Sequence, residues 1–342
     1  MFAFLKHIYE IFYGGYATPT KYEVFWRLAL NSYNINKTSQ MVMFEQTIHR
    51  GIFMQAQIDL HVHSTISDGT LTPAEVVQKA SQIGLRAMAL TDHDTVSGVA
   101  QAKEEATLRH IELISGVELS TMYREKEIHV VGLLVDEADS AFTKKLQEFR
   151  KRRDDRNETM LSLLQKEGFH IDMQSLYDAY PDTVITRVHI ARFLAESGQV
   201  KDIRAAFDKY IGNDCRCYVP RVMMTPMDAC ELIYAAHGFP VLAHPILYHM
   251  NKDKLCTLIS EMKEIGPLGI EAFYSTYMPG EEALIKKIAS ENDLLLSGGS
   301  DFHGANKPMI QLGTGKGRLA IPYSVLENLK QAHALSQSNI PS

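Results

Sequence analysis

The amino-acid sequence predicts an α/β fold with a helical insertion. From residue 58 onward, short apolar runs alternate with helical patterns, which is typical of repeated strand–helix units around a parallel sheet. Between residues 140 and 236 this alternation stops and helical patterns dominate. We therefore expect one α/β unit that carries an inserted group of helices.

The first strand–helix unit has the clearest local signals. Residues 58–63 favour a strand, because the run is short, mostly apolar and followed by a polar loop. Thr72-Pro73-Ala74-Glu75 is a capping box with proline at the first helical position. It predicts a helix that ends at Gly84.

The remaining elements follow in chain order. We expect strands at residues 87–90, 111–114, 128–135, 240–243, 269–273 and 294–297, and a helix over 96–109. In the insertion we expect helices at 141–167, 187–197, 201–210 and 226–237. We assign residues 57–139 and 237–325 to the α/β unit, 140–236 to the insertion, 326–342 to a C-terminal helix and tail, and 1–56 to an N-terminal extension.

Composition narrows the class of protein. The chain has 342 residues, of which 45% are hydrophobic and 22% charged, as in ordinary globular proteins. A formal net charge of -6 argues against a broadly basic surface that coats nucleic acid. The four cysteines lack the paired spacing of a zinc ribbon, so we expect free thiols.

We expect neither a secretory signal nor a membrane-spanning helix in this sequence. The apolar start of the chain is interrupted by Lys6, His7 and Glu10, unlike the core of a secretory signal. Nowhere do roughly 18 apolar residues follow one another, as a membrane helix requires. We expect a cytoplasmic protein without membrane contact.

Histidines and acidic residues recur at the ends of the expected strands. His61 and His63 lie two residues apart on the first strand, so their rings point to the same side. Such a pair alone is usually structural. Seven further residues lie on or just after other strands: Asp68, His93, Glu118, His129, His244, Asp301 and His303. C-terminal strand ends converge on one face of a parallel barrel. If these histidines and carboxylates were buried there only for packing, they would lose their contact with water at a large desolvation cost. We therefore predict a metal site.

These residues stand in motifs that resemble the PHP (polymerase and histidinol phosphatase) domain family over roughly residues 57–320. The matching segments are Asp59-Leu60-His61-Val62-His63-Ser64, Thr91-Asp92-His93, Glu118, His129, Ala243-His244-Pro245 and Ser300-Asp301-Phe302-His303. The resemblance implies a distorted TIM-like (β/α)7 barrel of the PHP type. It also implies a phosphoric ester hydrolase that uses a metal-activated hydroxide.

The resemblance further implies about three divalent ions. One would be held by His61, His63, Glu118 and Asp301, a second by Glu118, His129 and His244, and a third by Asp68, His93 and His303. Ligation by nitrogen and oxygen alone suits manganese, iron or zinc, and the resemblance favours manganese. Asp92 and Asp94 flank His93 and either orient ligand imidazoles or cap the loop.

The helical insertion resembles that of the PHP subfamily that acts on nucleoside 3',5'-bisphosphates and on the 5' ends of short RNA. Arg153 and Arg156 share the apolar stripe of the helix at 141–167, so they bind a substrate phosphate or extend to solvent. Arg187 and His189 resemble the pair near the subfamily's substrate phosphate, and their alternative role is to stabilise the helix start. Nucleotides or short RNA are the expected substrates.

Two alternatives to this activity stay open. One is a small-molecule phosphatase of the histidinol phosphate type, which shares the scaffold. The other is a non-catalytic PHP module, such as those attached to DNA polymerases, although every ligand position is filled here and the chain leaves no room for a polymerase. Tyr277 stands where related sequences often have histidine, which leaves the finer substrate preference undecided.

Overall fold

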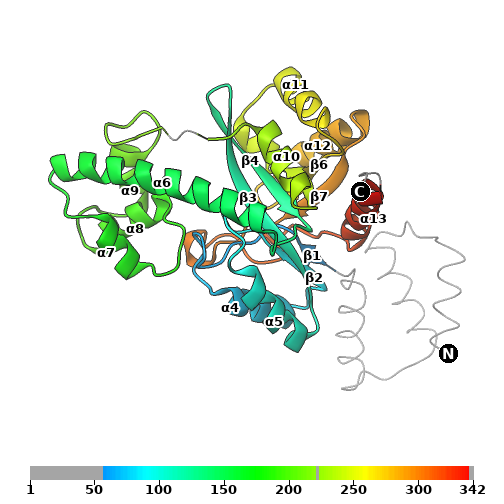
Figure 1. Cartoon of the computed structure of the whole chain (residues 1–342), viewed down its shortest axis with the longest axis horizontal. Coiled ribbons are helices and arrows are strands. Elements are labelled where there is room, and N and C mark those ends of the chain that lie inside the picture. Colours follow the sequence, from blue (N-terminus) through cyan, green and yellow to red (C-terminus); the bar gives the residue numbers. More distant parts are fainter. Residues whose placement is uncertain (1–56, 221–222, 339–342) are drawn as a thin grey trace, which may run out of the picture. The chain divides into compact units, whose positions relative to one another are not determined.

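In the residues that the structure describes, 57–220 and 223–338, seven strands form one sheet whose order in space follows the order in the chain (Figure 1). The structure is a computed structural model. The strands are β1 (Ile58–Asp59), β2 (Ala87–Leu90), β3 (Glu112–Tyr123), β4 (Lys126–Leu133), β5 (Phe239–Leu242), β6 (Gly269–Tyr274) and β7 (Leu295–Gly299). The expected N-terminal extension, residues 1–56, lies outside the described residues.

The sheet curls until its two edges meet. The backbone N–H of Leu60 donates to the Gly298 carbonyl at 3.2 Å, and that of Asp301 donates to the His61 carbonyl at 2.8 Å. Gly299 allows this approach, because a Cβ there would lie 2.3 Å from the His61 Cβ. The result is a nearly closed, distorted barrel, which confirms the predicted fold class. β1 is shorter than the expected strand at 58–63, since the residues after Asp59 pair with the segment following β7.

The expectation of a parallel sheet was wrong at one strand. β4 runs antiparallel to both β3 and β5, while the other neighbouring pairs are parallel. A tight turn at Arg124 and Glu125, with φ of 45° and 68°, joins β3 to β4 in place of a helix. Positive φ at both turn residues is the geometry that matches the twist of a hairpin. Because β3 pairs with β4 up to this hairpin turn, it ends at Tyr123, well beyond the expected residues 111–114.

Helices surround the sheet (Figure 1). They are α4 (Pro73–Gln82), α5 (Val99–Arg109), α10 (Pro226–Ala235), α11 (Lys252–Lys263), α12 (Pro279–Glu291) and α13 (Ser324–Ser338), with short turns η3 (Pro245–Tyr248) and η4 (Gly304–Asn306). The predicted capping box is confirmed at α4, where Thr72 and Glu75 bond reciprocally. α5 begins three residues later than expected.

Between β4 and α10 the chain forms a helical group with its own apolar core. It comprises α6 (Ser140–Lys166), α7 (Met173–Ala179), α8 (Arg187–Glu196), α9 (Ile203–Ala206) and the π-helical turn η2 (Phe207–Ile211). Figure 1 shows the long helix α6 extending away from the sheet with α7 to α9 beside it. Met160, Leu176 and Ile190 meet in this core without any exposed surface. The boundaries 140–236 remain a prediction.

Two further expectations concern membranes and cysteines. Among the helices of the described ranges, none combines the length and the apolar character that a membrane crossing needs. Cys215, Cys217, Cys230 and Cys256 are free thiols, as predicted.

Candidate metal centre

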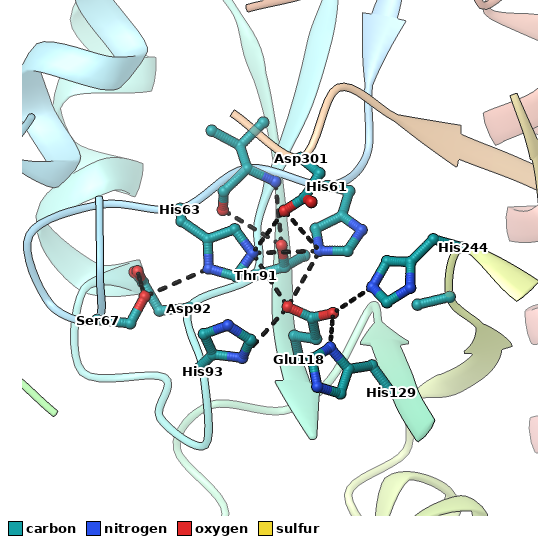
Figure 2. A network of polar contacts seen from close by, with 12 residues as sticks. His61, His63, Ser67, Thr91, Asp92, His93, Glu118, His129, His244 and Asp301 are labelled. Atoms are coloured by element: carbon teal, nitrogen blue, oxygen red, sulfur yellow. Dashed lines mark hydrogen bonds and ion pairs between the residues drawn. The ribbon is translucent and has the colours of Figure 1, made fainter. Parts of the chain in front are cut away.

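The carboxylate of Glu118 lies at the centre of a cluster of five imidazole rings (Figure 2). Its side chain comes from the middle of β3 and is 1% exposed. The Oε2 atom lies 3.2 Å from His61 Nε2, 3.1 Å from His63 Nε2 and 3.2 Å from His93 Nδ1. The Oε1 atom lies 2.7 Å from His129 Nδ1 and 3.1 Å from His244 Nε2. One buried carboxylate therefore faces ring nitrogens from several segments.

Three overlapping groups of side chains could each hold an ion. In each group, the ligand atoms lie within 4.8 Å of one another: His61, His63, Glu118 and Asp301; His63, Asp68, His93 and His303; and His93, Glu118 and His129. The first group is the set that the family resemblance implies. The second adds His63 to the implied set. In the third, His93 takes the place of His244, whose Nε2 nevertheless contacts Glu118.

The ligand atoms are directed at common points in a way that suits cations. His61 Nε2 and His63 Nε2 lie 3.1 Å apart and both face Glu118, and they lie 3.7 and 3.5 Å from Asp301 Oδ1. Two imidazoles and two carboxylates that point at one position form a typical first coordination sphere. Nitrogen and oxygen donors without thiolate suit hard or borderline divalent ions. The donor set therefore fits divalent metal.

The electrostatics of the cluster keep its acids charged. Burial alone would raise the pKa of Glu118, but His61, His129 and His93 hold it well below its usual value. Burial also opposes ionisation of Asp301, whose pKa Lys307 and His303 nevertheless hold well below the usual range. Both carboxylates are therefore ionised at neutral pH and available to a cation.

The antiparallel strand β4 explains how His129 reaches the cluster. Ser120 on β3 pairs directly with His129 on β4, so their side chains share one face of the sheet. Glu118 lies two residues before Ser120 and therefore points to that same face. Because β4 runs in reverse, its first residues lie at the end of the barrel where the parallel strands finish. His129 thus joins ligands that follow parallel strands.

Two candidate ligands have unusual backbone geometry. His244 has φ of 26° and Asp301 has φ of 55°, and residues other than glycine rarely adopt positive φ values. Such strain persists where the surrounding structure enforces it, and it concentrates at functional sites. Here it directs the side chains that follow β5 and β7 into the cluster.

Asp92 and Asp94 act through different partners. Asp92 accepts hydrogen bonds from Ser64 N at 2.8 Å and Ser67 Oγ at 2.6 Å, and Ser67 Oγ lies 3.3 Å from His63 Nδ1. It therefore supports His63 through a serine and holds the loop after β1 at the same time. Asp94 forms an ion pair with Arg153 instead.

The sequence did not predict two contacts to the candidate ligands, one buried and one partly exposed. Glu271 on β6 accepts a hydrogen bond from His244 N at 2.7 Å, and its Oε1 lies 2.9 Å from His61 Nδ1. The sequence signal that could have indicated this contact is the charged Glu271 within the otherwise apolar strand β6. Lys307 Nζ lies 2.6 Å from Asp301 Oδ2, and nothing in its sequence context marks it.

A cavity of about 330 Å³ opens beside the cluster. It is lined by Asp68, His93, Ser120, Glu127, His129, Arg153, Thr186, Arg187, Val188, Phe207, His244, Leu247 and Tyr248. Arg187 donates to Asn213 Oδ1 at 2.9 Å and lies 3.4 Å from Glu127 Oε2. Arg153 pairs with Asp94, and Arg156 is buried on α6 and does not line this cavity. The two arginines of the cavity come from the helical group.

His189 does not line the same cavity as Arg187. Its Nδ1 accepts the Thr186 N–H at 3.0 Å, which caps α8, and the ring lines a different cavity together with Arg192. Burial lowers the pKa of His189 to about 4. The capping role that the sequence left open is therefore present, while a role in phosphate binding stays a prediction.

Tyr277 supports the loop after β5 from outside the cluster. Its hydroxyl accepts a hydrogen bond from Ile246 N at 3.3 Å, and its ring lies 5.2 Å from that of Tyr274. Tyr274 in turn donates to Asp301 Oδ2 at 2.6 Å. Tyr277 is therefore one side chain removed from a candidate ligand.

Comparison with known proteins agrees with this geometry. The sequence matches the PHP domain family over residues 59–266. It is 36% identical over 253 residues to the 5'-3' exoribonuclease of Haemophilus influenzae, covering 73% of this chain and 91% of the relative. It is 36% identical over 250 residues to the 3',5'-nucleoside bisphosphate phosphatase of Chromobacterium violaceum, covering 72% and 87%. A solved Chromobacterium violaceum amidohydrolase with bound sulfate and no metal is 32% identical, with a TM-score of 0.71 over 81% of this chain and 96% of that one. This chain belongs to the PHP domain family.

Proposed function

We propose that this protein is a metal-dependent phosphoesterase that removes the 3'-phosphate from nucleoside 3',5'-bisphosphates and also shortens 5'-phosphorylated RNA from its 5' end. The observation that carries the proposal is the buried cluster around Glu118, which opens on a cavity lined by Arg153 and Arg187. A cluster that would hold divalent cations, beside the guanidinium groups of two arginines, suits a phosphate ester, because metal cations and arginines both neutralise charge on phosphoryl oxygens.

We propose that the cluster holds about three divalent ions and that manganese is the favoured metal. The ligands would be His61, His63, Asp68, His93, Glu118, His129, His244, Asp301 and His303. When bound, such ions lower the pKa of a water molecule and stabilise the attacking and leaving oxygens at phosphorus. Glu118 contacts ring nitrogens of separate groups through its two oxygens, so it would bridge neighbouring sites.

The side chains around the cavity have separate proposed tasks. Arg187 is partly exposed and its guanidinium contacts a neutral amide and a carboxylate, so it can turn to a phosphate and donate two parallel hydrogen bonds. Arg153 is held by Asp94 and Ser120, so it would supply a fixed positive charge at the cavity wall. Glu127 lies 3.5 Å from His129 Nε2, where it would hold the ring orientation.

The substrate class follows from the relatives. They include a nucleoside bisphosphate phosphatase and an exoribonuclease, and the similar solved structure binds sulfate, a tetrahedral oxyanion like phosphate. One site can serve both activities, because each breaks a phosphate ester at a nucleotide 3' oxygen. The cavity is of a size that accepts one nucleotide.

The test is to incubate manganese-loaded protein with adenosine 3',5'-bisphosphate and follow phosphate release and the nucleotide formed. We expect adenosine 5'-monophosphate, and we expect the Glu118→Gln variant to be inactive and depleted of metal. Short 5'-phosphorylated RNA is the second substrate. If histidinol phosphate alone reacts, the scaffold is an enzyme for a different small molecule. If no phosphate ester reacts and no stoichiometric metal binds, the domain is a non-catalytic module.

A further inference from the structure

The cavity beside the metal centre is lined by two chemically different kinds of side chain. Candidate ligands and arginines form one kind. Val188, Phe207 and Leu247 form the other, and we call these three the apolar wall. Val188 and Phe207 belong to the helical group and Leu247 to the turn after β5, so separate segments of the chain contribute apolar side chains to one cavity. No candidate ligand needs such a surface, so it requires its own explanation.

Leu247 is held in place beside the candidate ligand His244. It lies in η3, and the next residue, Tyr248, donates its hydroxyl hydrogen to the Ala243 carbonyl at 2.5 Å. The same hydroxyl accepts a hydrogen bond from His129 N at 3.0 Å. The turn is thereby tied to β4, which carries His129, and to the segment after β5 that carries His244. Leu247 nevertheless keeps 42% of its surface exposed. An exposed leucine is ordinary by itself, but this one lines the cavity beside a candidate metal centre.

Phe207 is presented to the cavity by a rare backbone form. It begins the π-helical turn η2, and such turns often mark functional sites. The turn closes with Gly212 N donating to the Phe207 carbonyl at 2.9 Å. A Cβ at Gly212 would lie 2.4 Å from that carbonyl oxygen, so a glycine is required there. The ring of Phe207 packs partly on the core of the helical group and partly lines the cavity.

We propose that the apolar wall is the binding site for the nucleobase of the substrate, an inference that rests on the proposed function. The wall lines the same cavity as the side chains suited to phosphate, and Val188 follows Arg187 in the first turn of α8. A nucleotide has this same polarity, with a charged phosphate at one end and a flat, weakly polar ring at the other. Aromatic and branched apolar side chains bind such a ring through its face.

The chemistry of the wall also sets its selectivity. The side chains of Val188, Phe207 and Leu247 carry no hydrogen-bonding group, so the wall cannot read the edge of a base. Contact through the ring face tolerates every base. We therefore infer that purine and pyrimidine nucleotides bind with similar strength. Low base selectivity is what the shortening of RNA of mixed sequence requires.

The experiment compares adenosine 3',5'-bisphosphate with its abasic analogue, the 3',5'-bisphosphate of 1-deoxyribose. For Leu247→Ala and Phe207→Ala, we expect kcat/KM on the adenosine compound to fall roughly 5- to 100-fold through KM, and kcat/KM on the abasic compound to stay unchanged. Phe207→Tyr, which keeps an aromatic ring, should retain wild-type KM. Leu108→Ala is the matched control, because Leu108 is 73% exposed on α5 and does not line the cavity.

Calorimetric binding of adenosine 5'-monophosphate and of abasic 5'-monophosphate to the metal-loaded protein separates this inference from the proposed function. If wild-type protein hydrolyses neither bisphosphate, the proposed function fails, and preferential binding of the adenosine compound that Leu247→Ala removes would still support the wall. Equal losses on both substrates, or no loss on either, would overturn it. Since Leu247 is partly exposed, its alanine variant should fold even if Phe207→Ala does not.

Discussion

Glu271→Gln is the perturbation that tests the buried support of the metal centre most directly. Glu271 is 1% exposed, its Oε1 lies 2.9 Å from His61 Nδ1 and its Oε2 accepts the His244 N–H at 2.7 Å. A glutamine has one acceptor oxygen, so its amide N–H must face a former donor. One charge-assisted hydrogen bond is lost, although the side-chain shape is kept.

The magnitude follows from that lost bond. A hydrogen bond to a charged group contributes about 1.5–3 kcal/mol, which corresponds to a loss of roughly 10- to 100-fold in metal affinity. Carboxylates that orient a ligand histidine have effects of the same size. Although burial lowers the pKa of His61, the carboxylates of Glu118 and Glu271 together hold it well above its usual value. The variant therefore also lowers the pKa of His61, which must lose its proton before it can bind metal.

The assay is competition between the protein and a fluorescent chelator for Mn²⁺, with phosphatase activity measured against free metal. We expect weaker metal binding, and activity that excess Mn²⁺ restores. Glu264→Gln, an exposed change of the same type on the surface, is the control. Unchanged metal affinity would refute the reasoning, and a loss of activity that no metal concentration restores would assign Glu271 a direct role in the reaction.

Three further predictions concern the cavity and its supports. Arg187→Met should raise KM for adenosine 3',5'-bisphosphate roughly 10- to 100-fold while bound metal, measured by elemental analysis, stays constant; a parallel loss of metal would contradict a phosphate-binding role. Asp94→Asn leaves the buried guanidinium of Arg153 without its charged partner, so urea unfolding should show a loss of about 3–5 kcal/mol that Arg153→Met in the same chain partly restores. The pKa of His189 is about 4 when folded against an ordinary 6.5, so the unfolded chain takes up the proton first and stability should fall by about 3 kcal/mol as pH drops from 6.5 to 4. His189→Asn, which keeps a cap acceptor, should lose that part of the pH dependence in unfolding titrations, and an unchanged profile would exclude the histidine as its source.

The local parts of the fold could be predicted from neighbouring residues. The capping box at Thr72 and Glu75 places the start of α4, because its bonds join residues three apart. The run at β2 was predicted with its observed bounds, since four apolar residues between polar ones form a buried strand. The type and order of the candidate ligands were likewise visible, because metal sites draw on histidine and carboxylate at strand ends.

Strand direction could not be predicted in this way. β4 has the apolar pattern of any buried strand, and periodicity does not distinguish parallel from antiparallel pairing. The direction depends on the tight turn at Arg124 and Glu125, neither of which is a residue favoured in such turns. This antiparallel strand decides that His129 meets Glu118.

What the sequence by itself determined is the chemical character of this protein: the family motifs, the types of candidate ligand and most of the elements that carry them. The tertiary structure alone decided which charges meet. Arg153 and Asp94 are 59 residues apart and His61 and Glu271 are 210 apart, so no local pattern could pair them. It also brought Val188, Phe207 and Leu247 to the lining of one cavity. Burial is the physical reason, because a charge removed from water must find a partner wherever the fold brings one.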